Sequence, residues 1–126
     1  MKTLTKEQVE QKFGDNDDTL LINVLPREKF LKEHIPGSIN IDANASDFIR
    51  QFEKKAADKN QMVIVYCAGF DCEASTKAAE KLERAGYKKV FDFKGGLEEW
   101  REKGGKTRSL RPTARKSAGK DQNAGF

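Results

Sequence analysis

The sequence predicts an α/β fold in which a central, mostly parallel sheet is covered by helices on both faces. Residues 19–25 and 62–66 are almost continuously apolar and rich in β-branched side chains. Such runs are typical of strands that are buried on both faces of a parallel sheet. Segments with helical spacing of apolar residues lie between the strand-like runs, and this alternation indicates a parallel α/β sheet.

The first half of the chain opens with a helix. Residues 5–14 predict it, because Thr5 and Gln8 have the spacing of a capping box and Gly14 can end the helix. The strand at residues 19–25 follows. The other elements expected in this half are a short helix that opens at Pro26 and runs through residue 31, a turn and strand at residues 33–42, and a helix that Ser46 caps and that runs to about residue 57.

The second half is arranged around the strand at residues 62–66, which leads directly into Cys67. After a loop, residues 76–86 predict a helix, and residues 90–93 predict a further strand. A turn at residues 94–96 then leads into a last short helix at about residues 97–101. We interpret the two glycines of that turn as allowing a tight strand-to-helix connection, because the lysine and hydroxyl residue of a phosphate-binding loop are absent.

The composition indicates one domain followed by a basic tail. At 126 residues the chain is long enough for a single domain with its own core. Residues 106–126 contain six basic residues and one acidic residue and so carry +5, whereas residues 1–105 carry −1. The apolar pattern also stops near residue 104. We therefore expect a domain at residues 1–105 and a basic, disordered tail at residues 106–126.

The basic tail has three interpretations. Clustered lysine and arginine without interleaved aromatic residues can neutralise phosphates but cannot read bases. The tail could instead contact an acidic partner or be a solvated extension, and we favour the extension over a nucleic-acid partner. No apolar run approaches the roughly 20 residues of a membrane span, and the N-terminus has no hydrophobic signal region. We therefore expect a soluble, cytoplasmic protein without a membrane partner.

Cys67 ends the buried strand and precedes a loop that enters a helix. The amides of such a loop and the positive end of the helix dipole favour a thiolate over a thiol. The sequence therefore predicts that Cys67 is a catalytic nucleophile with a lowered pKa; the alternative is a buried structural thiol. The loop expected to bind the substrate consists of Ala68, Gly69, Phe70, Asp71, Cys72 and Glu73.

Cys72 lies five positions after Cys67 and has two interpretations. As a resolving cysteine it would attack a persulfide or an oxidised form of Cys67 and leave a disulfide between the two. Alternatively it fills the loop and takes no part in chemistry. Two cysteines and one histidine leave a zinc site one ligand short, so we expect neither a metal nor a cofactor.

Three other residues, His34, Glu73 and Phe70, each have a structural and a functional interpretation. We favour a structural hydrogen-bonding role for His34 over general-base catalysis, and an ordinary helix-start role for Glu73 over substrate recognition. Phe70 either guides an apolar or thiol-bearing partner or packs inward. The aromatic residues expected in the core are Phe48, Phe52, Phe91, Phe93 and Trp100.

Five segments in order resemble the single-domain rhodanese-like family over roughly residues 5–103. They are residues 20–24 (LLINV), 34–41 (HIPGSINI), 63–67 (VIVYC), 78–87 and 94–100. The resemblance implies the three-layer rhodanese-like fold. It also implies a sulfurtransferase whose strand-end cysteine takes sulfane sulfur from a donor as a persulfide and passes it to a nucleophile. Cys67 matches that cysteine.

The chain departs from the family pattern around this cysteine. Cys72 stands where the family has an arginine, and residues 73–74 intervene before Ser75. Asn23 and Leu25 replace the family's acid and arginine after the early strand. Since a charged hydrogen bond contributes about 1.5–3 kcal/mol, the loss of these cations should weaken thiosulfate binding. The spacing resembles a branch of the family with a second cysteine in the active-site loop.

We therefore expect an enzyme, a sulfurtransferase or persulfide carrier. Its expected donor is polysulfide, a persulfide or, less efficiently, thiosulfate, and its acceptor is a thiol or another nucleophile on a small molecule or a protein. Two alternatives stay open: a non-catalytic binding or regulatory module, and a dithiol oxidoreductase that uses Cys67 and Cys72. Phosphatase chemistry is disfavoured because it needs the loop arginine as an electrostatic clamp.

Overall fold

The computed structural model describes residues 2–14 and 18–110. Five strands form one sheet in the order β1-β5-β4-β2-β3, and each neighbouring pair in it is parallel. This confirms the predicted α/β class. The strands are β1 (Lys2–Thr3), β2 (Leu20–Asn23), β3 (Ile39–Asn40), β4 (Met62–Tyr66) and β5 (Lys89–Phe93).

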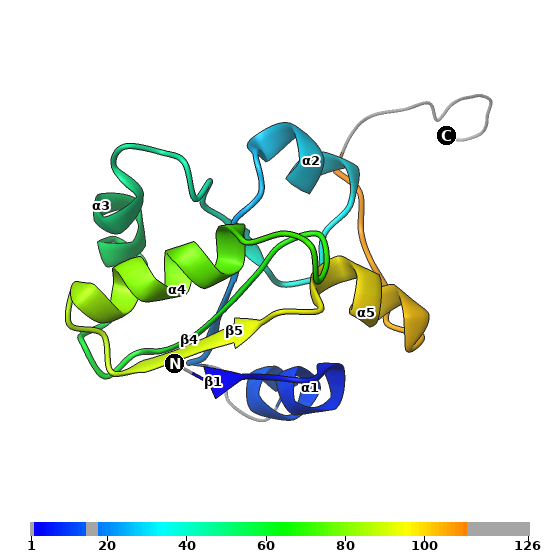
Figure 1. Ribbon diagram of the computed structural model, residues 1–126, viewed down its shortest axis with the longest axis horizontal. Helices are drawn as coiled ribbons and strands as arrows, with labels where there is room; N and C mark the ends of the chain where they lie inside the picture. Colours follow the sequence, from blue (N-terminus) through cyan, green and yellow to red (C-terminus); the bar gives the residue numbers. More distant parts are fainter. Residues whose placement is uncertain (1, 15–17, 111–126) are drawn as a thin grey trace.

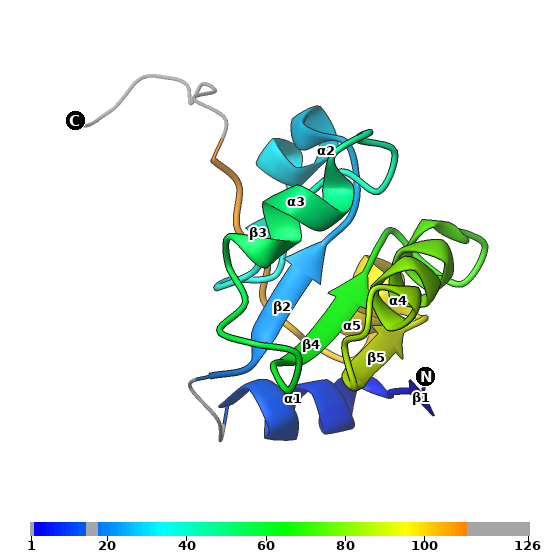
Figure 2. The same ribbon diagram turned by 90° about the vertical axis from the view of Figure 1, so that its left-hand side faces the viewer.

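Helices cover both faces of this sheet. They are α1 (Lys6–Gly14), α2 (Arg27–Lys32), α3 (Phe48–Glu53), α4 (Ala74–Arg84) and α5 (Gly96–Glu102). Figure 1 shows α3 and α4 on one side of the sheet and α1 on the other, and Figure 2 shows the strands between them. Within residues 2–14 and 18–110, none of these helices is long and apolar enough to cross a membrane.

The core is centred on β4, the middle strand. Its side chains from Val63 to Tyr66 are fully buried, as expected of a strand covered on both faces. Ala78, Ala79 and Leu82 occupy one face of α4 and are fully buried, and α4 contacts both β4 and β5. These small and branched side chains allow the helix to lie close to the sheet. The helix that follows Cys67 is therefore firmly attached to the core.

The capping box predicted for the first helix is present, whereas β1 and both ends of α3 differ from the prediction. Gln8 accepts a hydrogen bond from the Thr5 amide at 2.8 Å, and the Gln8 amide donates to the Thr5 hydroxyl at 3.3 Å. The two-residue edge strand β1 has no sequence pattern that predicts it. Helix α3 begins after Asp47 rather than Ser46 and ends at Glu53, soon after Phe52, its last fully buried apolar side chain.

Helix α4 begins two residues earlier than predicted. Glu73 occupies its N-cap position, and the amide of Lys77 donates to the Glu73 carbonyl at 3.0 Å. Ala74 and Ser75 therefore belong to the first helical turn. This brings Ser75, which the sequence placed before the helix, next to the cysteine loop.

Residues 106–110 are hydrogen-bonded to the domain, although the tail was expected to begin there. Arg108 and His34 exchange two backbone hydrogen bonds, at 2.8 and 2.9 Å, in an antiparallel bridge. The amide of Leu110 donates to a backbone carbonyl of α2 at 2.8 Å. Backbone groups make these contacts, so no apolar pattern marks the segment. The rest of the expected tail, residues 111–126, lies outside the described residues.

Candidate active site

The candidate site lies at the carboxyl edge of the sheet, where parallel α/β proteins commonly bind ligands. Cys67 is the first residue after β4. In the register of the sheet, Tyr66 of β4 pairs with Phe93 of β5, so Cys67 and Lys94 leave neighbouring strands at the same level. Figure 1 shows the loop after β4 beside the start of α5. Three connections therefore meet around Cys67: its own loop, the start of α4 and the turn into α5.

The start of α5 fixes the backbone of Cys67. The amide of Leu97 donates to the Cys67 carbonyl at 3.0 Å, and the amide of Glu98 donates to the Ala68 carbonyl at 2.9 Å. Gly96 has a φ of 53°, and a Cβ atom at this position would collide with the carbonyl oxygen of Cys67. The glycine pair thus forms the predicted tight turn, and Gly96 is required for the close approach of α5 to the loop.

Cys67 and Cys72 are joined by a disulfide. Their Cα atoms are 6.5 Å apart, inside the range of about 4.4–6.8 Å that disulfides span. The amide of Cys72 donates to the Gly69 carbonyl at 3.0 Å, which folds the loop back on itself. Cys67 is fully buried and Cys72 is half-buried, so Cys72 is the more exposed of the two residues.

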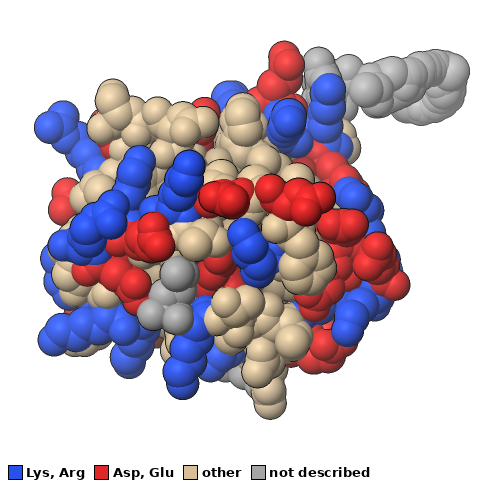
Figure 3. Space-filling model, viewed as in Figure 1, with Lys and Arg blue, Asp and Glu red and all other residues tan. Residues whose placement is uncertain are grey.

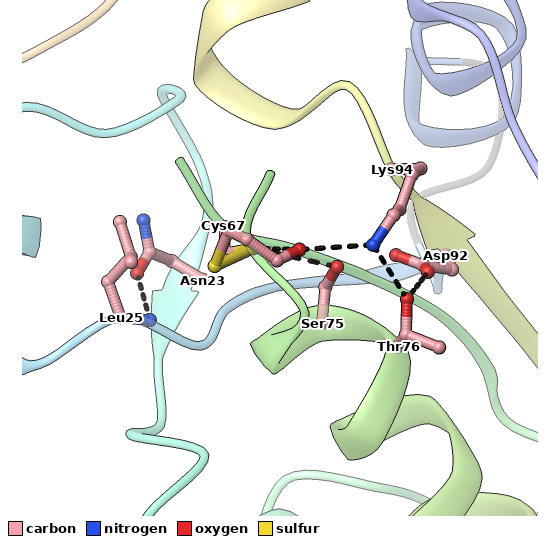
Figure 4. Close-up of a disulfide and its surroundings, with 8 residues drawn as sticks. Asn23, Leu25, Cys67, Ser75, Thr76, Asp92 and Lys94 are labelled. Carbon is pink, nitrogen blue, oxygen red and sulfur yellow. Dashed lines mark hydrogen bonds between the residues drawn. A yellow bond between two sulfur atoms is a disulfide. The ribbon is translucent and has the colours of Figure 1, made fainter. Parts of the chain in front are cut away.

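Polar groups surround the sulfur of Cys67 (Figure 4). Its Sγ atom lies 3.6 Å from the hydroxyl oxygen of Ser75 and 3.5 Å from the carbonyl oxygen of Cys72. Ser75 is fully buried in the first turn of α4. In the reduced protein this hydroxyl can donate to a thiolate, and the positive end of the α4 dipole favours the same charged form. The site therefore has groups that can stabilise an anionic sulfur.

A hollow of about 410 Å³ opens beside Cys72 and the loop residues that follow Cys67. Asp71 and Glu98 bring negative charge to its lining, and Arg101 brings positive charge. The guanidinium of Arg101 forms a salt bridge with Glu33, which offsets much of that positive charge. Figure 3 shows acidic side chains gathered on the side of the molecule where α5 lies. The mouth of the site is therefore more acidic than basic.

Comparison with known proteins identifies the family. The sequence matches the rhodanese-like domain family over residues 5–103. The chain belongs to the rhodanese-like family. It is 37% identical over 86 residues to adenylyltransferase and sulfurtransferase UBA4 of Candida albicans, and this match spans 64% of the chain but only 19% of that longer protein. It is 32% identical over 83 residues to thiosulfate sulfurtransferase GlpE of Pseudomonas syringae, spanning 65% of the chain and 72% of that protein.

A solved structure shows the same fold. The thiosulfate sulfurtransferase from Pseudomonas aeruginosa superposes with a TM-score of 0.77 over 88% of the chain and 21% of that protein. Its sequence identity is 20%, so this likeness concerns the fold alone. Together these matches confirm the resemblance and the fold class predicted from the sequence. The names of the sequence relatives support sulfur transfer as the general chemistry of this rhodanese-like domain.

Phe70 is an exposed aromatic residue of the loop. Its side chain is 54% exposed, so of its two interpretations the inward-packed one is wrong. The other aromatic residues behave as predicted: Phe48, Phe52, Phe93 and Trp100 are buried, and Phe91 packs partly buried against the core.

His34 makes structural contacts. It is 5% exposed, its Nδ1 atom lies 2.8 Å from the Phe30 carbonyl oxygen, and its ring stacks on that of Phe30. These contacts confirm its interpretation as a structural residue. Asn23, which replaces the family's acid, accepts a hydrogen bond at 2.9 Å from the amide of Leu25, so the two substituted positions stabilise one turn.

Sequence analysis missed two charged residues at this rhodanese-like site. Lys94 donates hydrogen bonds from its Nζ atom to the Cys72 carbonyl at 3.1 Å and to the Thr76 hydroxyl at 3.3 Å. Arg101 reaches the hollow from α5. Parallel strand order is the signal that points to Lys94, because the residues that follow two paired parallel strands are neighbours. No comparable signal marks Arg101, which reaches the site through the packing of α5.

Proposed function

We propose that this rhodanese-like domain is a sulfurtransferase or persulfide carrier that moves sulfane sulfur through a persulfide on Cys67. The observation that carries the proposal is the setting of Cys67 at the end of β4, with its backbone held by α5 and its sulfur beside Ser75 and the start of α4. The relatives named as sulfurtransferases support it. A buried thiol with a purely structural role would not need this polar surrounding.

The proposed reaction has two displacement steps. In the first, the Cys67 thiolate attacks the outer sulfur of a persulfide donor; a Cys67–sulfur bond forms, the donor's S–S bond breaks and the donor leaves as a thiolate. In the second, an acceptor thiolate attacks the outer sulfur of the Cys67 persulfide, and the Cys67 thiolate leaves. Each step exchanges one S–S bond for another. No external oxidant or reductant is therefore required.

We further propose that the donor is a polysulfide or a persulfide, on a small molecule or a protein, and that thiosulfate is used poorly. Cys72 supplies no positive charge where the family has an arginine, and Asp71 and Glu98 add negative charge to the hollow. Thiosulfate brings two negative charges into this site, whereas an organic persulfide brings one to its reacting end. Repulsion should therefore weigh more against thiosulfate.

Cys72 is proposed to resolve the persulfide. Its thiolate attacks the inner sulfur, Sγ of Cys67, so that a Cys67–Cys72 disulfide forms and hydrosulfide leaves. The 6.5 Å separation of the two Cα atoms supports this step. Because Cys67 in the disulfide has no free thiolate, a thiol reductant must open the disulfide before the next donor can react.

A second candidate function, dithiol oxidoreductase, is favoured by the same disulfide. In that case the two cysteines would exchange electrons with partner thiols and disulfides and no sulfur atom would be transferred. The two functions differ in whether a sulfur atom passes from donor to acceptor.

The test is a transfer assay with the reduced protein, a small thiol acceptor, and glutathione persulfide, polysulfide or thiosulfate as donor. We expect turnover that requires Cys67 and a kcat/KM at least about tenfold higher for glutathione persulfide than for thiosulfate, because one lost charged hydrogen bond is worth about 1.5–3 kcal/mol. Equal use of both donors would contradict the proposed donor class. Disulfide exchange without sulfur transfer would establish the oxidoreductase instead.

A further inference from the structure

Lys94 lies just beyond β5, beside the cysteine loop, and is half-buried. Figure 4 shows its ammonium group directed at the loop and at the first turn of α4. It donates to the Cys72 carbonyl at 3.1 Å and to the Thr76 hydroxyl at 3.3 Å. The Thr76 hydroxyl in turn donates to the buried carboxylate of Asp92 at 2.7 Å. This chain of contacts fixes the position of a cation at the edge of the site.

The carbonyl of Cys72 connects Lys94 to the reactive sulfur. Its oxygen lies 3.5 Å from Sγ of Cys67 and 3.1 Å from Nζ of Lys94, so the ammonium lies within about 7 Å of the sulfur. A Cys67 thiol could donate to this oxygen, and that interaction would favour the neutral form. The ammonium bonded to the same oxygen brings positive charge close to the sulfur. A nearby positive charge favours the thiolate.

Charged and titratable groups lie on the cysteine loop and on the elements around it. Those groups are Asp71 and Cys72 on the loop, Glu73 at the start of α4, Asp92 and Lys94 on and after β5, and Glu98, Glu99 and Arg101 on α5. Most of them are acidic, and Arg101 is paired with Glu33. Lys94 is therefore well placed to offset acids that would otherwise disfavour an anionic sulfur.

We propose that Lys94 is an electrostatic and positioning residue that holds the Cys72 carbonyl and stabilises the Cys67 thiolate and persulfide. It supplies, from the neighbouring strand, the positive charge that the loop lacks at Cys72. The inference rests on the proposed function of Cys67 as a nucleophile. It adds the identity of the group that activates this nucleophile.

The test compares alkylation rates as a function of pH in the reduced Cys72→Ser protein, where Cys67 is the single cysteine. Lys94→Gln removes the charge and keeps a hydrogen-bond donor, and Lys94→Arg keeps the charge. Lys89→Gln is the matched control, because it makes the same charge change at the exposed, opposite end of β5. Lys94→Met replaces Lys94→Gln if the latter does not unfold cooperatively.

We expect the midpoint of the alkylation profile to rise by about 1 pH unit in Lys94→Gln, the lower end of the shift that an opposite charge close by produces. Below the midpoint this corresponds to alkylation about tenfold slower. Lys94→Arg and Lys89→Gln should leave the midpoint within about 0.3 unit of the parent, which is well below that shift. In the protein with both cysteines, Lys94→Gln should also lower the disulfide reduction potential by about 30 mV, the equivalent of a tenfold change.

An unchanged midpoint in Lys94→Gln, with a low midpoint in the parent, would overturn the role of Lys94 and leave the function of Cys67 standing. Equal shifts in Lys94→Gln and Lys94→Arg would also overturn it, because they would show a requirement for the lysine side chain rather than its charge. A parent midpoint near the ordinary thiol value of about 8.5 would overturn both the inference and the activated nucleophile on which it rests.

Discussion

The turn at residues 34–38 and the loop at residues 67–75 both lie beside the end of β4, but they use their polar groups differently. In the turn, the Ile35 amide donates to the Tyr66 hydroxyl at 3.0 Å, and the Ser38 and Tyr66 hydroxyls are 2.8 Å apart. The polar groups of the turn thus form hydrogen bonds with Tyr66 of the fold and not with the cysteine loop. In the loop, Ser75 and the Cys72 carbonyl are directed at the sulfur of Cys67 beside an open hollow.

A polar residue near the end of β4 is therefore not functional merely because of its position. The hydrogen-bond partner of each polar group determines whether its substitution affects stability or sulfur transfer. Where the partners belong to the fold, substitution should reduce stability and spare sulfur transfer. Where the partner is the Cys67 sulfur, substitution should reduce transfer and spare stability.

The largest expected effect separates these two regions directly. With both proteins reduced, Cys67→Ser should lower sulfur transfer by at least about a thousandfold, because a hydroxyl cannot replace the thiolate nucleophile, and should leave the unfolding free energy nearly unchanged. Ser38→Ala should cost about 1 kcal/mol of unfolding free energy, since it removes hydrogen bonds to Ile35 and Tyr66, and should keep transfer. Transfer assays and urea unfolding measure both. The distinction between turn and loop fails if the two variants exchange these phenotypes.

Gly96→Ala should affect stability and transfer together, because this glycine belongs to both the fold and the site. The added Cβ would meet the Cys67 carbonyl, and the backbone has a positive φ. We expect a loss of about 2–4 kcal/mol in unfolding free energy and a further decrease in transfer, measured at a temperature where the variant is folded. Gly104→Ala is the control, because Gly104 also has a positive φ but a Cβ atom added there would meet nothing within 4 Å. Equal losses in both variants would show that the contact with Cys67 is unimportant.

Tyr66→Phe removes the hydroxyl that the turn binds, and it should change how stability depends on pH. Burial raises the pKa of Tyr66 above the ordinary value of 10.0, so the folded protein favours the neutral phenol. This contribution to stability is complete below pH 10 and is lost as the pH rises through the folded pKa. The variant should lose about 1–2 kcal/mol at about pH 8 from missing hydrogen bonds. It should also show a smaller decrease between about pH 8 and pH 11; identical alkaline decreases in urea unfolding would contradict the assignment to Tyr66.

The smallest effect concerns donor choice. Glu98→Gln removes a negative charge from the hollow and should raise kcat/KM for thiosulfate about two- to fivefold, the equivalent of about 0.5–1 kcal/mol for an exposed charge. Glutathione persulfide should change less. Glu102→Gln, on the same helix but outside the lining of this hollow, serves as the control. An equal gain in both variants would indicate a general effect of net charge.

The sequence was sufficient to predict the central strand, the parallel sheet and the position of Cys67, because apolar periodicity and the family resemblance both mark them. It did not predict the Lys94 contact, since this depends on which strands are neighbours. It also did not predict the exposure of Phe70 or the hydrogen bonds of residues 106–110. Those features follow from tertiary packing and backbone pairing, which leave no local pattern. The starts of α3 and α4 were misplaced by one and two residues, and neither N-cap residue, Asp47 or Glu73, makes a side-chain capping hydrogen bond that a sequence pattern could mark.

Whether Cys67 carries sulfur can be read from the intact mass of the reduced protein after brief exposure to glutathione persulfide. We expect a gain of one sulfur atom that is absent in Cys67→Ser and longer-lived in Cys72→Ser, where the resolving thiol is missing. The parent should then lose the sulfur and form the Cys67–Cys72 disulfide. A sulfur adduct that persists in Cys67→Ser, or no adduct in any of the three proteins, would contradict sulfur transfer through Cys67.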